Sequence, residues 1–150
     1  MLIVDFLIVE WRSAMDHPSA DLKERTKKFA LRIMRVVRSL PPGLEGRMIG
    51  KQLLRSGTSV AANYRAVCRA RSRPEFLSKL AIVIEEADET AFWLELLTDA
   101  GLIAEAKLKD LQSEANQLVA IFNASRTTAK KGVHSTINNQ QSRIPDKKAS

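Results

Sequence analysis

The sequence predicts an all-α protein in which four amphipathic helices pack antiparallel as a bundle. Apolar residues recur at three- and four-residue intervals along most of the chain. Helix breakers or caps at Pro41-Pro42-Gly43, Ser72 and Gly101 divide this pattern into four segments. With 150 residues, the chain is long enough for one domain with a substantial core.

The first helix is expected at about residues 21–39, ended by Pro41 and Pro42. Its buried stripe is Leu22, Thr26, Phe29, Ile33, Val36 and Leu40. The other side carries Lys27, Lys28, Arg32, Arg35 and Arg38. Residues 1–14 are interpreted as an appendage, either sequence upstream of an initiator at Met15 or a short docking segment. Their apolar run is far shorter than the roughly 20 residues of a membrane span, and no membrane association is expected.

The second helix is expected at about residues 44–71. At 100° per residue, one arc of about 80° holds six basic residues. These are Arg47, Lys51, Arg55, Arg65, Arg69 and Arg73. The apolar phase continues through residues 56–59, so Gly57 falls inside the apolar arc, which suggests close approach of a neighbouring backbone or a local bend. A phosphate-binding glycine loop fits poorly, because no strand precedes it.

The third helix is expected to begin with a capping box, Ser72 to Glu75, and to end at Gly101. Its core stripe is Phe76, Leu80, Val83, Ala87, Ala91 and Leu94. Phe92, Trp93 and Leu96 lie off this stripe, so the helix is apolar nearly all round at this point. A subunit interface would bury them. The alternative is that they cap the edge of the bundle or lie under residues 1–14.

The fourth helix is expected at about residues 104–130, with a seven-residue alternation typical of an antiparallel seam. Its stripe is Leu108, Leu111, Ala115, Leu118, Phe122 and Ser125. The expected organisation is an N-terminal extension, partly disordered, at 1–19, a bundle at 20–130 and a disordered tail at 131–150.

Charge is distributed unevenly around a net value of +7. Residues 44–73 carry seven basic residues and one acid, whereas residues 74–99 carry seven acids and one lysine. The basic stripe could bind phosphates, pair with the acidic helix within the bundle or across a subunit boundary, or be solvated. Its richness in arginine favours recognition of phosphate or carboxylate.

No catalytic constellation is recognisable in the sequence. The acidic run at residues 85–89 could suggest a carboxylate metal site, but no histidine lies on an expected helix, and a solvated or interface face is favoured. We expect no catalytic residue, no metal and no cofactor. The single cysteine, Cys68, excludes an internal disulfide and indicates a reducing compartment, here the cytoplasm.

Residues 53–103 resemble the signature of a bacterial family of four-helix-bundle proteins, also called 23S rRNA-intervening-sequence proteins. The matching residues are Arg55-Ser56, Ser59-Val60, Ala62-Asn63, Phe76, Lys79-Leu80, Glu86-Ala87, Glu89-Thr90 and Trp93-Leu94-Glu95-Leu96. Many members read Asn-Ile-x-Glu-Gly or Asn-Ile-x-Glu-Ala after this Ser-Val pair, whereas this chain has Asn63-Tyr64-Arg65-Ala66-Val67, without the glutamate. The family name records a gene location, from which no activity follows.

The resemblance implies an up-and-down bundle that assembles into a ring-like homo-oligomer, typically a pentamer. It also implies similarity to the accessory protein of diversity-generating retroelements, which binds nucleic acid and a reverse transcriptase. We therefore predict a non-enzymatic oligomer that binds RNA or DNA without sequence preference. The residues expected to contact it are Arg47, Lys51, Arg55, Arg65, Arg69, Arg73, Arg32 and Arg35. The alternative is a protein-interaction scaffold whose charged faces serve only assembly.

Overall fold

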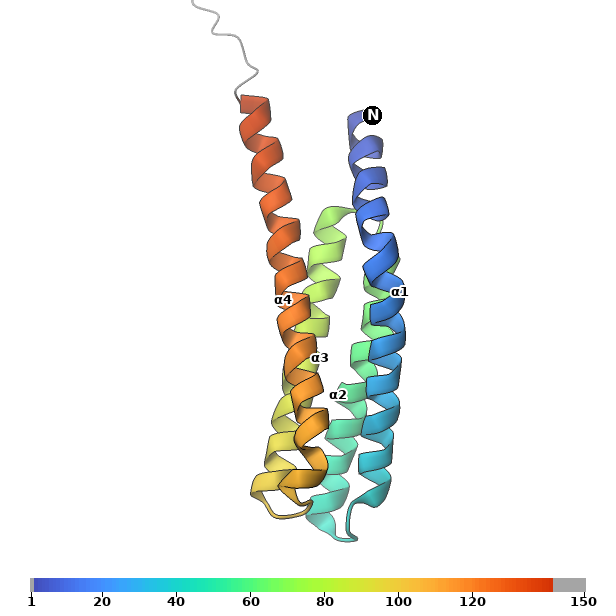
Figure 1. Ribbon diagram of the computed structural model, residues 1–150, viewed down its shortest axis with the longest axis vertical. Helices are drawn as coiled ribbons and strands as arrows, with labels where there is room; N and C mark the ends of the chain where they lie inside the picture. The colour runs from blue at the N-terminus through green and yellow to red at the C-terminus, as the bar shows by residue number, and fades with distance from the viewer. Residues whose placement is uncertain (1, 142–150) are drawn as a thin grey trace, which may run out of the picture.

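The computed structural model describes the backbone of residues 2–141 and the side chains of residues 21–131. It consists of four helices, α1 (Leu2–Ser39), α2 (Leu44–Cys68), α3 (Arg73–Asp99) and α4 (Glu105–Gln141). Consecutive helices run in opposite directions (Figure 1). The predicted all-α class and its four helices are confirmed, and no strand occurs within residues 2–141.

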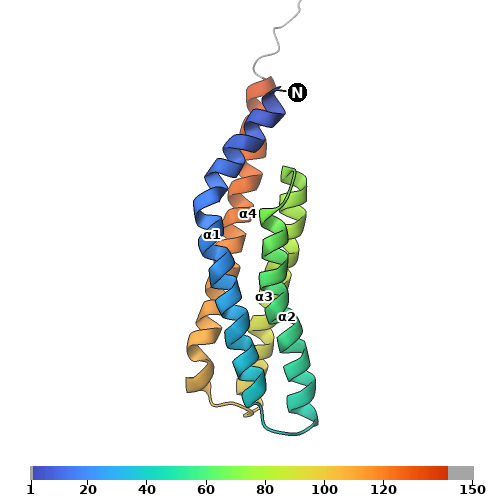
Figure 2. The same cartoon turned by 90° about the vertical axis from the view of Figure 1, so that its right-hand side faces the viewer.

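The two outer helices are longer than the sequence predicted. Helix α1 begins at Leu2 instead of Asp21, and α4 continues to Gln141 instead of ending near Lys130. Residues 2–39 contain no glycine that would interrupt α1. The glycine at position 132 does not stop α4, because a single glycine costs a helix only about 1 kcal/mol. Both helices project beyond the α2–α3 turn (Figures 1 and 2). The remainder of the expected disordered tail, residues 142–150, lies outside the described residues.

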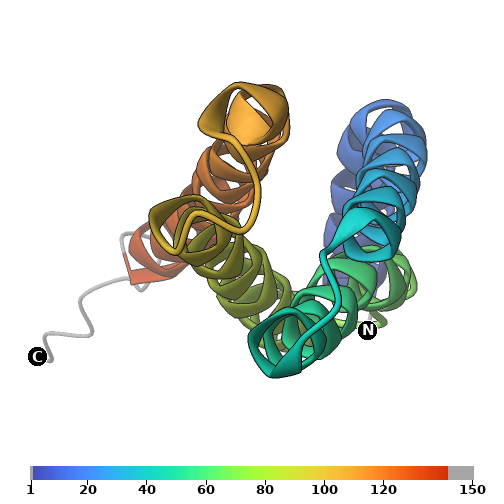
Figure 3. The same ribbon diagram turned by 90° about the horizontal axis from the view of Figure 1, so that it is seen from below.

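The helices are arranged in chain order, so that each packs mainly on its neighbours in sequence. Seen from below, they follow a U with α1 and α4 at its two ends (Figure 3). Contact between α1 and α4 is slight compared with the three consecutive pairs. Arg25 of α1 nevertheless reaches α4, where its Nε donates to Glu114 Oε1 at 2.7 Å and its Nη2 to Gln117 Oε1 at 2.9 Å.

The predicted apolar stripes of all four helices form one core. Its largest fully buried side chains are Phe29, Ile33, Leu53, Val60, Tyr64, Phe76, Leu80, Leu94, Leu97, Leu108, Leu118 and Phe122. The rings of Tyr64 and Phe122 join α2 to α4, with centroids 5.5 Å apart. None of the helices described is both long and apolar enough to cross a membrane.

Gly57 serves the packing of α2 against α1, although not by the approach of a backbone that the sequence suggested. A β-carbon at position 57 would lie only 2.8 Å from Cγ1 and Cγ2 of Ile33, a buried side chain of α1. The glycine therefore makes room for a branched side chain. Helix α2 runs unbroken through this position, as the apolar phase predicted.

The turn between α2 and α3 contains a variant of the predicted capping box. The Ser72 hydroxyl accepts a hydrogen bond from the Glu75 amide at 3.2 Å, as expected for an N-cap. The Glu75 carboxylate, however, accepts from the amide of Arg71 at 2.8 Å, and not from that of Ser72. The pairing with Lys79 and then the bond from the Arg71 amide lower the pKa of Glu75. At the other end of α3, Gly101 adopts a positive φ of 71°, as the sequence predicted for a C-terminal glycine.

Candidate nucleic-acid interface

A basic groove lies between α1 and the C-terminal half of α2. It is lined by Lys23, Glu24 and Lys27 of α1 and by Thr58, Ala61, Ala62, Arg65 and Arg69 of α2 and its C-cap. Its volume is about 540 Å³. We call this surface the α1–α2 groove.

Helical spacing arranges the four cations of the groove in two short rows. Lys23 and Lys27 are one turn apart on α1, and Arg65 and Arg69 are separated by the same interval on α2. All four side chains are exposed, and none forms an ion pair with the side chains of residues 21–131. Among the described lining residues the cations face one acid, Glu24, so this part of the groove has a positive potential and N–H donors available to a ligand.

Small side chains of α2 separate the two rows. Ala62 is exposed and Ala61 is half-buried, so neither fills the space between the long basic side chains. The Thr58 hydroxyl donates to the Leu54 carbonyl oxygen at 2.7 Å, which commits its proton to its own helix. Hydrogen-bond donation to a ligand in the groove therefore comes from the lysines and arginines.

Of the basic residues predicted on α2, only Arg65 and Arg69 line this groove. Arg47 and Lys51 are exposed at the opposite end of α2, beside the turn that joins it to α1. Eighteen residues of helix place Arg47 about 27 Å from Arg65 along the axis. The predicted stripe therefore exists on α2 as two separated groups.

Arg73 does not continue the line of Arg65 and Arg69, which corrects the sequence prediction. Helix α2 ends at Cys68, three residues before its predicted end, and Arg73 is the first residue of α3. The chain reverses direction between them, so one helical register no longer relates their side chains. Arg73 is half-buried, and its Nε has no hydrogen-bond partner among the described residues.

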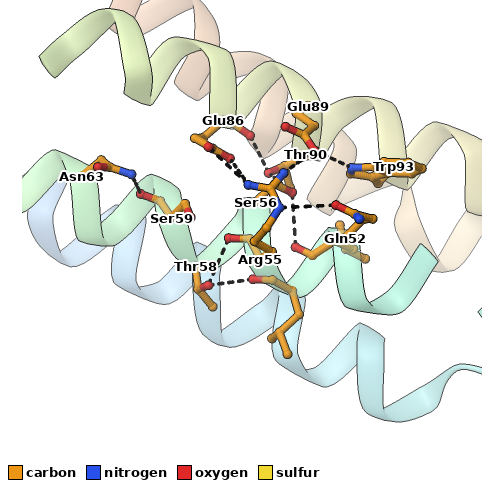
Figure 4. A network of polar contacts seen from close by, with 12 residues as sticks. Gln52, Arg55, Ser56, Thr58, Ser59, Asn63, Glu86, Glu89, Thr90 and Trp93 are labelled. Carbon is orange, nitrogen blue, oxygen red and sulfur yellow. Dashed lines mark hydrogen bonds and ion pairs between the residues drawn. The ribbon is translucent and has the colours of Figure 1, made fainter. Parts of the chain in front are cut away.

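Arg55 is held in a network between α2 and α3 (Figure 4). Its Nη1 donates to Glu86 Oε2 at 3.2 Å, and its Nη2 pairs with Glu89. The Trp93 indole also donates to Glu89 at 3.1 Å. The hydrogen bond from Arg55 and then that from Trp93 lower the pKa of Glu89. For Arg55, the structure therefore matches the alternative in which the basic helix pairs with the acidic one inside the bundle.

A second polar contact lies beside this network in the α2–α3 seam. The hydroxyl groups of Ser56 and Thr90 are 2.9 Å apart, and both side chains are fully buried. The Thr90 hydroxyl donates to the Glu86 carbonyl oxygen at 2.7 Å, so the Ser56 hydroxyl is the donor in the pair. This contact fixes the register of the two helices.

The remaining predicted cations, Arg32 and Arg35, lie on α1 outside the groove. Arg32 is half-buried and Arg35 is exposed. Arg32 follows Lys27 by five residues, which turns it about 140° away around the helix. Sequence reasoning noted Lys27 only as part of the polar side and did not single out Lys23. Identifying them required knowing which face of α1 lies beside α2.

The three predicted interface residues are only partly covered. The Phe92 side chain is 51% exposed, whereas Trp93 and Leu96 are half-buried. The rings of Phe92 and Trp93 form an edge contact with centroids 4.9 Å apart. Exposed acids, including Glu85, Asp88 and Glu95, occupy the same helix, so Phe92 stands on an acidic surface.

Comparison with known proteins identifies the family. The model of the 23S rRNA-intervening sequence protein family matches residues 19–124. A crystal structure of a protein of unknown function from the S23 ribosomal protein family of Bacteroides thetaiotaomicron has 32% sequence identity and a TM-score of 0.67. The match covers 73% of this chain and 97% of that one. No curated protein sequence matches. The chain therefore belongs to the 23S rRNA-intervening sequence protein family.

Proposed function

We propose that the protein is a non-catalytic, nucleic-acid-binding bundle of the bacterial cytoplasm, and that the α1–α2 groove is its binding surface. The observation that carries this function is the difference between Arg55 and the groove cations. Arg55 is neutralised by two carboxylates of its own chain, whereas Lys23, Lys27, Arg65 and Arg69 have no described acidic partner. Phosphate groups would supply the missing negative charge.

Phosphate binding by these cations has a measurable thermodynamic signature. Each neutralised phosphate releases condensed counterions, so the observed association constant falls as salt rises. The slope of log K against log salt is about −0.7 per phosphate contact on single strands and −0.9 on duplex DNA. Four groove cations therefore predict a slope of up to about −3 on a single strand.

The test is fluorescence anisotropy with labelled RNA and DNA at several salt concentrations. Removing two cations with Arg65→Gln and Arg69→Gln is expected to weaken binding and reduce the slope by about 1.4 on a single strand. The matched control carries Arg47→Gln and Lys51→Gln, which remove the same charge from the other end of α2. Equal losses of affinity in the two variants would show that nucleic acid binds through the overall charge of the protein and not through the groove.

A second candidate function is a protein-interaction scaffold, for which the exposed Phe92 on its acidic surface is the supporting observation. Phe92, together with the partly exposed Trp93 and Leu96, forms an apolar patch rimmed by acids, and such patches mark interaction surfaces. In this alternative, Phe92, Trp93 and Leu96 form an interface in a homo-oligomer, such as the proposed pentameric ring, or bind a protein partner such as a reverse transcriptase.

Light scattering distinguishes the scaffold from a monomeric bundle. Phe92→Ser is the preferred variant, because Trp93 also bonds to Glu89 and its loss would disturb the fold. A folded Phe92→Ser protein is expected to have a lower particle mass than the parent protein. Ile82→Ser, which replaces another exposed apolar residue of α3, is the control. An unchanged mass would show that Phe92 does not hold subunits together.

A further inference from the structure

We propose that the α1–α2 groove binds a single nucleic-acid strand through its sugar-phosphate backbone and makes no use of the bases. This inference rests on the proposed function and specifies its ligand. It follows from the spacing of the cations on two packed helices and from the chemistry of the lining residues.

The two rows of cations suit one phosphate chain. Residues four apart on a helix are about 6 Å apart along the axis, which is comparable to the step between successive phosphates of one strand. Packed helices have axes about 8–10 Å apart, so Lys23 and Lys27 face Arg65 and Arg69 across a narrow channel. A flexible strand can follow this channel, with each phosphate between a lysine and an arginine. A rigid duplex would place only part of one backbone there.

The lining residues offer little to a base. Proteins that grip single-stranded bases usually stack them on aromatic side chains. None of the eight lining residues is aromatic, and Tyr64, on the same helix, is buried in the core. No amide side chain is among the described lining residues, and the Thr58 proton is already committed to Leu54. Binding energy must therefore come from the phosphates.

Glu24 limits the affinity of this channel. Its carboxylate is exposed among four cations without forming an ion pair with any described side chain. A phosphate entering the groove would meet this like charge. The substitution Glu24→Gln keeps the shape and removes the charge, and we expect it to tighten strand binding about two- to fivefold at low salt, the range for exposed charge pairs. An unchanged or weakened affinity would mean that the strand does not pass Glu24.

The experiment compares three ligands at equal concentrations of phosphate. They are a single-stranded DNA of about 12 nucleotides, a strand of that length without bases, and a duplex. We expect the abasic strand to bind within about fivefold of the normal strand, and the duplex to bind more weakly than either. The expected order is diagnostic, since the higher charge density of a duplex would favour it if binding depended on overall charge and not on the fit of one strand to the groove.

The outcomes separate this inference from the proposed function. Backbone-only recognition is wrong if the abasic strand binds more than about fivefold more weakly than the normal strand, or if the duplex binds as well as the single strand. Nucleic-acid binding stands in either case. If none of the three ligands binds, both are wrong.

A variant that blocks the channel gives an independent test. Ala62→Leu places a larger side chain between the rows without changing charge, and we expect it to weaken strand binding. Ala120→Leu, at an exposed alanine of α4, is the matched control and should bind as the parent does. Equal binding by a folded Ala62→Leu protein would contradict passage of the strand along the groove.

Discussion

Replacing Gly57 by leucine tests how α1 and α2 pack together. A β-carbon at this position would lie 2.8 Å from two carbons of Ile33 and 3.1 Å from a third. Contacts this short require a shift of one of the groups. Ile33 is fully buried, and a β-branched side chain has one strongly preferred rotamer in a helix. Its displacement would disturb the surrounding core.

Two opposing contributions set the expected change in the free energy of unfolding. Replacing a helical glycine by alanine gains about 1 kcal/mol of helix propensity. Overpacking a core costs about 1–3 kcal/mol, and sometimes more. Gly57→Ala should therefore lower the free energy of unfolding by about 0–2 kcal/mol. Gly57→Leu adds three further carbons at a closed site, and we expect a loss of about 2–4 kcal/mol.

Urea denaturation and thermal melts measure this loss, with Ala62→Leu as the control. Ala62 is exposed on the same helix, so its substitution should change stability by no more than about 0.5 kcal/mol. Combining Gly57→Ala with Ile33→Ala should relieve most of the clash, because the two closest carbons are absent and only the β-carbon of residue 33 remains, at 3.1 Å. Equal stability of Gly57→Leu and Ala62→Leu would refute the packing role of Gly57.

Two further substitutions test the buried and paired polar groups. Tyr64→Phe should change stability by no more than about 1 kcal/mol, because among the described residues the buried hydroxyl interacts only with the Cys68 thiol, a weak hydrogen-bonding group; a larger loss in urea denaturation would contradict this. Glu89→Gln should destabilise the protein at neutral pH. Since the folded-state pKa of Glu89 is lowered, the stabilisation exists above the ordinary glutamate pKa of about 4.3 and disappears as pH falls through the lowered value. Melts of parent and variant should then converge in acid, whereas a constant difference would contradict the ion pair.

The helices could be predicted because their signals are local. Apolar spacing located the core, and Ser72 and Gly101 marked the ends of α3. The helical extensions at residues 2–20 and 131–141 were missed, because residues 1–14 were interpreted as an appendage and the few apolar residues after Lys130 as a sign of disorder. Backbone helicity does not require a strong amphipathic pattern at every turn.

The candidate site could be predicted only in part, because it depends on contacts between helices. Spacing the residues of α2 by 100° each places Arg55, Arg65 and Arg69 in one arc of the helix. It could not show that Arg55 lies within reach of Glu86 and Glu89, whereas Arg65 and Arg69 lie beside α1. The difference depends on which neighbouring helix lies beside each part of α2. The sequence of α2 alone does not give this information.

Nuclear magnetic resonance of labelled protein can locate the bound strand on the molecule. Amide signals would be followed while a short single-stranded oligonucleotide is added at low salt. We predict that the signals of residues 23–27 and 58–69 shift, while those of Arg47 and Lys51 remain in place. Shifts concentrated at Arg47 and Lys51 or on α3, or no shifts at a saturating concentration of strand, would contradict binding in the α1–α2 groove.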